Sequence, residues 1–196
     1  GGDQGAHEGQ YDGRGLIGLP VEELQNLIRE VPKPVIARVN GFAIGGGHVL
    51  HVVCDLSIAS DKAVFGQVGP KVGSVDPGYG TAYLSRLIGE KRAREIWYLC
   101  RKYSAQQALD WGLVNAVVPH EQLDEEVQKW CEEILEKSPT ALSIAKRSFN
   151  ADSANIGGIG GLGMQALSLY YETEESKEGV AAYKEKRKPE FRKFYK

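Results

Sequence analysis

The sequence predicts an α/β protein whose C-terminal half is mainly helical. A short apolar strand over residues 34–39 precedes a glycine-rich turn, a buried helix over residues 48–54 and a second strand over residues 56–59. This order of elements is typical of an α/β unit. Helical spacing of apolar residues dominates from residue 81 onward. With 196 residues, of which 42% are hydrophobic, the chain is long enough to bury one core, and it shows no internal repeat.

The remaining elements are predicted by local signals. Residues 1–19 are rich in glycine and polar side chains, which is typical of a mobile loop. An amphipathic helix that ends before Pro32 is predicted by the apolar residues Val21, Leu24, Leu27, Ile28 and Val31. Glycines and prolines between residues 66 and 80 predict a long loop, and such loops are often functional.

Helices follow this loop. Residues 81–102 have helical spacing, and Ser104 is expected to cap a helix that stops at Gly112. Further along, we expect a strand over residues 113–118, an amphipathic helix over residues 123–135, and a helix that begins at Pro139 after a Ser138 cap.

Composition excludes several classes of function. A formal charge of −2 gives no sign of a nucleic-acid surface, and no apolar run approaches the length of a membrane span. The three cysteines are too few and too scattered for a disulfide framework. We therefore expect buried thiols in a reducing compartment, the cytoplasm.

The run Gly45-Gly46-Gly47 is the central candidate for a functional site. Glycines at a junction between a strand and a helix let a ligand approach free backbone N–H groups, and the helix N-terminus adds a positive dipole end. Such a site suits a phosphate or a developing oxyanion. The alternative interpretation is a tight turn selected for packing.

Ser74 and Asp76 are the polar candidates in the glycine-rich loop. They lie on the same side of an extended segment, so they could place a water molecule or carry a proton. The alternative is a local turn in which these side chains bond to nearby backbone. No G-x-S-x-G elbow is present, so a serine-hydrolase triad is not supported.

Two further patterns are interpreted as structural. The run from Gly158 to Gly163 matches a dinucleotide-binding string, but no strand precedes it, so we expect a flexible loop or small-residue packing. His48, His51 and Cys54 are three residues apart on a predicted helix and would drift round it, so we expect a packed helix and no metal site.

Several segments together resemble the crotonase (enoyl-CoA hydratase/isomerase) superfamily. They are residues 32–37, 40–47, 54–56 and 104–115, with Gly1-Gly2-Asp3 similar to the first oxyanion loop of that superfamily. The resemblance implies a ClpP-like spiral of ββα units, with residues 1–120 as the core and residues 121–196 as a helical oligomerisation region of the same domain. It also implies that the front of the fold and part of the CoA pocket are absent from this sequence.

The resemblance implies a thioester enolate held by the backbone N–H groups of Gly2 and Gly46. Coenzyme A would be part of the substrate, with no separate cofactor and no metal, and subunits would form trimers paired into hexamers. Lys186 matches a position that reaches CoA, although a solvated charged tail is the alternative. The other expected substrate or CoA contacts are Asp3, Gln4, Tyr11, Gln67 and Trp97.

Two positions depart from the hydratases of this superfamily. Those hydratases carry two glutamates that handle water, and the matching positions here are Val49 and Gly69. Neither residue can transfer a proton, so ordinary enoyl-CoA hydration is disfavoured.

Narrower similarities point to two relatives, naphthoate synthases and 2-ketocyclohexanecarboxyl-CoA hydrolases. The first close a ring by a Claisen condensation, and the second open a ring by its hydrolytic reverse. Val68 replaces a threonine that binds bicarbonate in some synthases, and Gly69 replaces an aspartate found in others. We therefore favour ring opening, in which Asp76 and Ser74 handle water and Tyr171 donates or relays a proton. A simple thioesterase and a non-catalytic binding protein are the alternatives from other classes.

Overall fold

The computed structural model describes residues 13–195. In this part of the chain, one three-stranded sheet has the order β1-β3-β6 and is entirely parallel. Its strands are β1 (Ile36–Val39), β3 (Leu56–Ser60) and β6 (Ala116–Val118). The expected α/β unit is confirmed, because β1 and β3 are parallel neighbours joined through a helix. The third strand is shorter than the predicted range of residues 113–118.

A second three-stranded sheet includes part of the predicted turn and has the order β2-β4-β5. Its strands are β2 (Phe42–Ile44), β4 (Val64–Gly66) and β5 (Tyr103–Ser104). The prediction of a turn over residues 41–47 is therefore wrong in its first half. Residues 41–47 contain four glycines, but three of these are at residues 45–47, and β4 supplies a parallel partner for the three apolar residues of β2. The turn itself is confined to Gly45, which has a φ of 59°.

The first five α-helices end close to the predicted breaks. They are α1 (Val21–Glu30), α2 (Gly46–Val53), α3 (Ala82–Ile88), α4 (Glu90–Leu99) and α5 (Ala105–Asp110). The predicted helical stretch over residues 81–102 is two helices, because Gly89 has a φ of 81° and ends the first. Ser104 caps α5 as expected, in a reciprocal capping box with Gln107.

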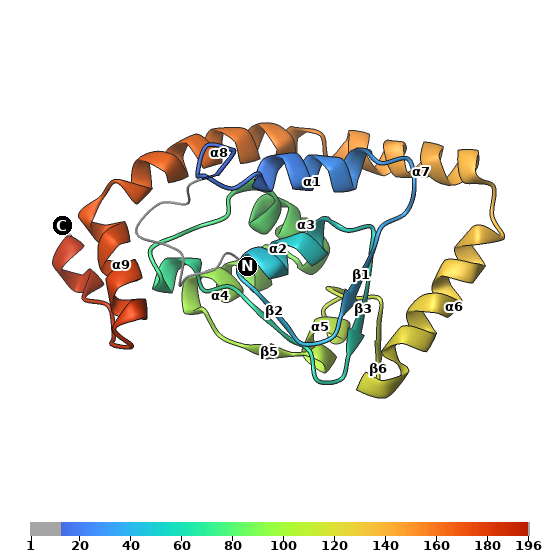
Figure 1. The fold of residues 1–196 in the computed structure, drawn as a ribbon, viewed down its shortest axis with the longest axis horizontal. Coiled ribbons are helices and arrows are strands. Elements are labelled where there is room, and N and C mark those ends of the chain that lie inside the picture. Colours follow the sequence, from blue (N-terminus) through green and yellow to red (C-terminus); the bar gives the residue numbers. More distant parts are fainter. Residues whose placement is uncertain (1–12, 196) are drawn as a thin grey trace.

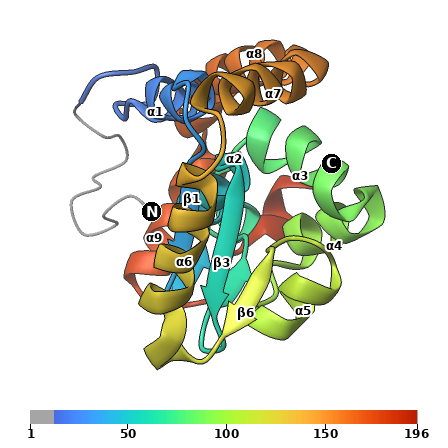
Figure 2. The same ribbon diagram turned by 90° about the vertical axis from the view of Figure 1, so that its right-hand side faces the viewer.

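The last four α-helices follow the outside of the molecule (Figure 1). They are α6 (Leu123–Leu135), α7 (Pro139–Asp152), α8 (Asn155–Tyr171) and α9 (Glu174–Lys184). Figure 2 shows α6 beside the β1-β3-β6 sheet, and Figure 1 shows α7 and α8 following one another end to end, with α1 below α8. The cap of α7 is confirmed, since the Ser138 side chain accepts from the amide of Ala141 and Pro139 begins the helix.

The glycine run from Gly158 to Gly163 is helical and lies within α8. The expectation of a flexible loop is wrong, whereas small-residue packing is confirmed. A Cβ on Gly163 would overlap the ring of Pro77, and a Cβ on Gly78 would lie 2.6 Å from Cα of Gly160. The glycines of α8 therefore let the helix approach the segment that follows Asp76.

Hydrogen bonds from buried and half-buried side chains join α7 to α1 and to the segment after it. The ammonium group of Lys146 donates to the carbonyl oxygens of Ile28 and Lys33, each at 2.8 Å, and to Oδ2 of Asp55 at 2.7 Å. Beside it, the amide of Asn150 donates to the carbonyl oxygen of Arg29 at 2.7 Å. Every proton of the Lys146 ammonium thus has an acceptor, which is what a buried cation requires.

Between residues 13 and 195, the helices are too short or too polar to cross a bilayer.

Candidate active site

A cavity of about 450 Å³ opens between α1, the start of α2, the segment after β4, and α8. Its walls combine glycine backbone, a few polar side chains and a large apolar surface. Six residues predicted for the site line it: Gly46, Gln67, Ser74, Asp76, Trp97 and Tyr171. These residues come from four separate stretches of the chain, so the fold brings together what the sequence placed far apart.

Gly46 lies on the cavity wall as the first residue of α2. The amide of a first helical residue has no carbonyl partner within its own helix, and it lies at the positive end of the helix dipole. The preceding amide, that of Gly45, donates to the carbonyl oxygen of Gly66 at 3.1 Å and fixes the turn against β4. The geometry leaves the Gly46 amide suited to hold an anionic oxygen.

Asp76 lies in the segment between two single-turn helices, η1 (Gly69–Lys71) and η2 (Gly78–Gly80). Burial raises the pKa of its carboxyl group to about 7, although a hydrogen bond from the Gly80 amide acts in the opposite direction. Within the described chain, Oδ1 of Asp76 is buried and has no hydrogen-bond partner. A carboxylate in this setting can take up a proton near neutral pH.

Ser74 and Tyr171 form a hydrogen-bonded pair on the same wall. Their hydroxyl oxygens are 2.8 Å apart, and they join the loop after β4 to the end of α8. Burial is the main cause that raises the pKa of the Tyr171 hydroxyl, and the Asp76 charge adds to it. Tyr171 therefore remains protonated at neutral pH and can donate.

Gln67 and Trp97 reach the cavity wall, but the indole N–H of Trp97 is already engaged. It donates to the carbonyl oxygen of Gly80 at 2.5 Å, so the indole presents its ring to the cavity and holds the segment after Asp76. The side chain of Gln67 is 1% exposed and its amide contacts Nδ1 of His48 at 3.3 Å.

The two positions that lack the hydratase glutamates have different structural settings. Val49 is fully buried and packs in a cluster with Val53, Tyr79 and Ile156, so it is part of the core. Gly69 lines the cavity, but a Cβ there would lie 2.5 Å from the carbonyl oxygen of Ser74 and 3.1 Å from the Trp97 ring. In this backbone, the space for a side chain at residue 69 is already filled.

The remaining predicted site residues are either outside the described part of the chain or away from this wall. Gly2, Asp3, Gln4 and Tyr11 lie outside the described residues. Lys186 is exposed, has a φ of 54°, and is not part of the cavity lining, so its contact with CoA stays a prediction.

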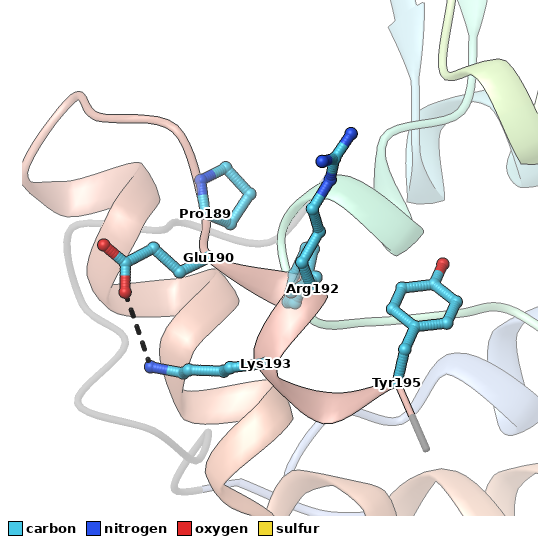
Figure 3. Close-up of a pocket in the computed structure, with 6 residues that line it drawn as sticks. Pro189, Glu190, Arg192, Lys193 and Tyr195 are labelled. Atoms are coloured by element: carbon cyan, nitrogen blue, oxygen red, sulfur yellow. Dashed lines mark ion pairs between the residues drawn. The ribbon is translucent and has the colours of Figure 1, made fainter.

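A larger hollow of about 850 Å³ lies at the C-terminal tail and is lined by residues 189–193 and Tyr195. Figure 3 shows the ion pair between Lys193 and Glu190, 3.9 Å apart, beside it. None of the predicted site residues that the structure describes lines this hollow, and we do not assign the reaction to it.

The apolar wall of the cavity is what the sequence interpretation missed. It is formed by Ile17, Leu19, Pro20, Val21, Leu24, Ile44, Leu50, Val68, Val72, Val75, Met164 and Leu167. A signal was present for α8, because Met164, Leu167 and Tyr171 fall on one helical face at spacings of three and four residues. Such a wall suits an apolar acyl group and keeps bulk water from the polar residues.

The described part of the chain contains no cluster of side chains typical of a metal site. Residues 13–195 contain no group of three or more His, Cys, Asp or Glu side chains arranged to hold a metal ion. His48 and His51 are instead packed edge to face, with ring centroids 4.9 Å apart.

Comparisons with known proteins agree on one family. The profile of the enoyl-CoA hydratase/isomerase family matches residues 1–194. An enoyl-CoA hydratase from Mycobacterium avium subsp. paratuberculosis K-10 is 29% identical with a TM-score of 0.82, over 87% of this chain and 70% of that chain. A methylmalonyl-CoA decarboxylase in complex with 2-nitronate-propionyl-CoA is 28% identical with a TM-score of 0.77, over 88% and 67%. An enoyl-CoA hydratase from Bacillus anthracis is 36% identical with a TM-score of 0.64, over 87% and 67%.

Proposed function

The chain belongs to the enoyl-CoA hydratase/isomerase family, whose fold is that of the crotonases, and from this premise we propose that it opens the ring of a cyclic β-ketoacyl-CoA by hydrolysis. A substrate such as 2-ketocyclohexanecarboxyl-CoA would give a dicarboxylic acid that keeps one CoA thioester. The general assignment as an acyl-CoA enzyme rests on the family, and the ring opening is our proposal.

The observation that carries this proposal is the replacement of the hydratase glutamates by a single buried carboxylate. Val49 is in the core and Gly69 has no space for a side chain, whereas Asp76 lines the cavity with a pKa of about 7. This wall can hold an enolate and activate one water, and among residues 13–195 its lining contains one carboxylate, that of Asp76, where a hydratase would use two. Hydrolytic cleavage needs only one such base.

The proposed step conserves atoms and charge. Water adds through its oxygen to the ring ketone carbon, and its proton passes to the ionised Asp76. The tetrahedral intermediate collapses, the bond between the former ketone carbon and the α-carbon breaks, and the electron pair forms the thioester enolate. Tyr171, paired with Ser74 at 2.8 Å, delivers a proton to the α-carbon. Asp76 returns its proton through this pair, so one water is consumed.

The enolate oxygen is the charge that must be stabilised. The Gly46 amide at the start of α2 is suited to donate to this oxygen, and Gly2 is expected to supply the second donor. Loss of one such donor typically raises the barrier by about 3 kcal/mol.

Ring closure to dihydroxynaphthoyl-CoA is the second candidate, because it passes through the same enolate. Gln67 and Trp97, which the resemblance assigns to both reactions, lie together on the cavity wall. Val68, however, is also part of that wall and presents methyl groups, which cannot bond a bicarbonate ion acting as the base. We therefore rank ring opening first.

The deciding experiment offers the protein both substrates and identifies the products by mass spectrometry. The proposal predicts a product from 2-ketocyclohexanecarboxyl-CoA that is heavier by one water and retains CoA. Release of free CoA would indicate a thioesterase instead. Cyclisation of succinylbenzoyl-CoA without ring opening would overturn the proposal in favour of the synthase, and binding without turnover would favour a non-catalytic protein.

We also propose that the chain acts as a homotrimer or homohexamer in the cytoplasm. Large apolar side chains on α7 and α8 are exposed in the single chain, among them Phe149 at 77%, Leu162 at 73% and Leu169 at 74%. Cys54, Cys100 and Cys131 are all free thiols, which suits a reducing compartment. Sedimentation equilibrium tests the assembly, and a monomer at micromolar concentration would contradict it.

A further inference from the structure

The imidazole of His48 lies directly behind the cavity wall, on the same helix as Gly46. Its side chain is fully buried, and its Nδ1 is 3.3 Å from the amide nitrogen of Gln67. Gln67 itself lines the cavity, whereas His48 does not. The side chain of Gln67 therefore connects His48 to the cavity.

The protonation state of this imidazole is set by its surroundings. Burial lowers the pKa of His48 to about 4, so the ring is neutral near pH 7. A neutral imidazole has one donor nitrogen and one acceptor nitrogen, and the position of its proton decides what it offers to Gln67. An Nδ1 without a proton accepts from the amide N–H and leaves the Gln67 carbonyl oxygen for the cavity. An Nδ1–H would bind that oxygen and leave the amide N–H facing the cavity.

The neighbouring His51 has the position of its own proton set by Ser57. The Ser57 hydroxyl donates to the His51 carbonyl oxygen at 3.2 Å, so its oxygen is left to accept from Nδ1–H of His51, also at 3.2 Å. This bond places the His51 proton on Nδ1 and leaves Nε2 as an acceptor. Among residues 13–195, neither Nε2 atom has a partner, and the two rings meet edge to face. Nε2 of His48 is then the nitrogen that carries the ring proton when Nδ1 accepts from the Gln67 amide.

The backbone holds the same two segments together. Strands β2 and β4 are parallel, with Ile44 opposite Gly66, and the Gly45 amide donates to the Gly66 carbonyl oxygen at 3.1 Å. The segments that follow β2 and β4 carry Gly46 and Gln67. They are thus joined by one backbone bond and by the His48–Gln67 contact.

We propose that His48 is a positioning residue that accepts a hydrogen bond from the Gln67 amide and so presents the Gln67 carbonyl oxygen to the cavity. This inference rests on the proposed function for its catalytic consequence. A water that attacks the ring ketone gives one proton to Asp76 and keeps the other. The Gln67 oxygen supplies a hydrogen-bond acceptor for this second proton on the same wall. His48 orients this acceptor without touching the substrate.

The position of the proton is tested directly by NMR on the protein labelled with ¹⁵N-histidine. The His48 ring is expected to carry its proton on Nε2, with Nδ1 bare, between about pH 6 and pH 8. The His51 ring is expected to carry its proton on Nδ1. A proton on Nδ1 of His48 would overturn the inference, whichever reaction the protein catalyses.

The functional consequence is tested with two substitutions of opposite character. His48→Asn keeps an acceptor near the position of Nδ1, whereas His48→Phe keeps the ring against His51 and Phe65 but removes the acceptor. We expect His48→Phe to lower kcat by about 10- to 100-fold with a smaller change in KM, and His48→Asn to stay within about threefold of the parent. A merely structural role would favour Phe, because it fills the buried site better.

His120→Phe is the control for the loss of a histidine, since its ring contacts Ser60 and does not line the cavity, and kcat is expected to change little. Equal kcat in the Asn and Phe variants of His48 would contradict the inference. If the parent protein opens no ring at all, the proposed function fails, but the NMR result still decides whether His48 orients Gln67.

Discussion

Lys146 and Asp76 are two ionisable side chains that the fold removes from water, and they are treated in opposite ways. Lys146 donates to two carbonyl oxygens and to Asp55, so its charge is fully bonded. Asp76 has one oxygen without a partner in the described structure, and burial raises its pKa to about 7. The first region uses a buried charge to hold α7 against α1. The second keeps a buried charge incompletely bonded, which leaves it able to exchange a proton.

The largest expected effect comes from replacing the reactive charge. Asp76→Asn should lower kcat by about 10²- to 10⁴-fold, because it removes the base that receives the proton of water. In the parent, kcat/KM should rise with pH through about 7, where the Asp76 carboxyl group ionises, and this limb should be absent from the residual activity of the variant. Asp110→Asn, on the exposed end of α5, is the control and should leave both rate and pH profile unchanged.

The same substitution should stabilise the fold. The pKa of Asp76 is raised from 3.8 to about 7 in the folded chain, so the proton-bound form is favoured there. The carboxyl group therefore destabilises the protein increasingly as the pH rises through this interval, and fully above it. Asp76→Asn should raise the free energy of unfolding at about pH 8, on the order of 2 kcal/mol, and change it little at about pH 4. Thermal melts at both values measure this, and a loss of stability at the higher pH would contradict it.

The next effect concerns the fully bonded charge. Lys146→Met removes the donor to two carbonyl oxygens and the cation beside Asp55, which keeps the Val35 amide as a donor, and it should reduce the free energy of unfolding by about 3 kcal/mol. Lys146 does not line the cavity, so kcat per folded molecule should stay within about twofold. Urea unfolding is the measurement. Lys137→Met removes an exposed ion pair with Glu136, 3.4 Å apart, and is expected to change stability by less than about 0.5 kcal/mol.

A smaller effect is expected where α8 supports the reactive segment. Gly163→Ala places a methyl group where the Pro77 ring lies, so it should displace the residue next to Asp76. We expect a loss of about 1–3 kcal/mol in stability and of about tenfold in kcat. Gly158→Ala lies in the same helix with no atom within 4 Å of the added Cβ. It should be neutral or slightly stabilising, and equal behaviour of the two variants would refute the packing argument.

The smallest effect is expected for the hydroxyl pair. Ser74→Ala removes the partner of Tyr171 and should lower kcat by roughly five- to tenfold, since a neutral hydrogen bond contributes about 1 kcal/mol. Tyr171→Phe should cost more, because it removes the proton donor. In the double variant, Ser74→Ala should add little to Tyr171→Phe, and full additivity would show that the two hydroxyls act independently.

Local sequence was sufficient for much of the fold. It also singled out Gly46, Ser74 and Asp76, which line the cavity. The caps at Ser104 and Ser138 and the α/β order depend on side chains within a few residues, so they could be predicted. The expectation of a loop at residues 158–163 failed, because glycine weakens an isolated helix by only about 1 kcal/mol each and packing against Pro77 and Gly78 overrides it. Strands β2 and β4 were missed for the same reason, since each depends on its distant partner.

By itself, the sequence determined the chemistry available to this protein: a glycine-rich helix start at Gly46, a carboxylate in the glycine-rich loop at Asp76, and no acid–base side chain at residues 49 and 69. Only the tertiary structure decided how that chemistry is arranged. It placed Tyr171 against Ser74, filled the space beside Gly69, raised the pKa of Asp76 and left His48 behind Gln67. The physical reason is that residue type fixes which groups can donate, accept or ionise. Burial and contacts between distant segments set their pKa values and their partners.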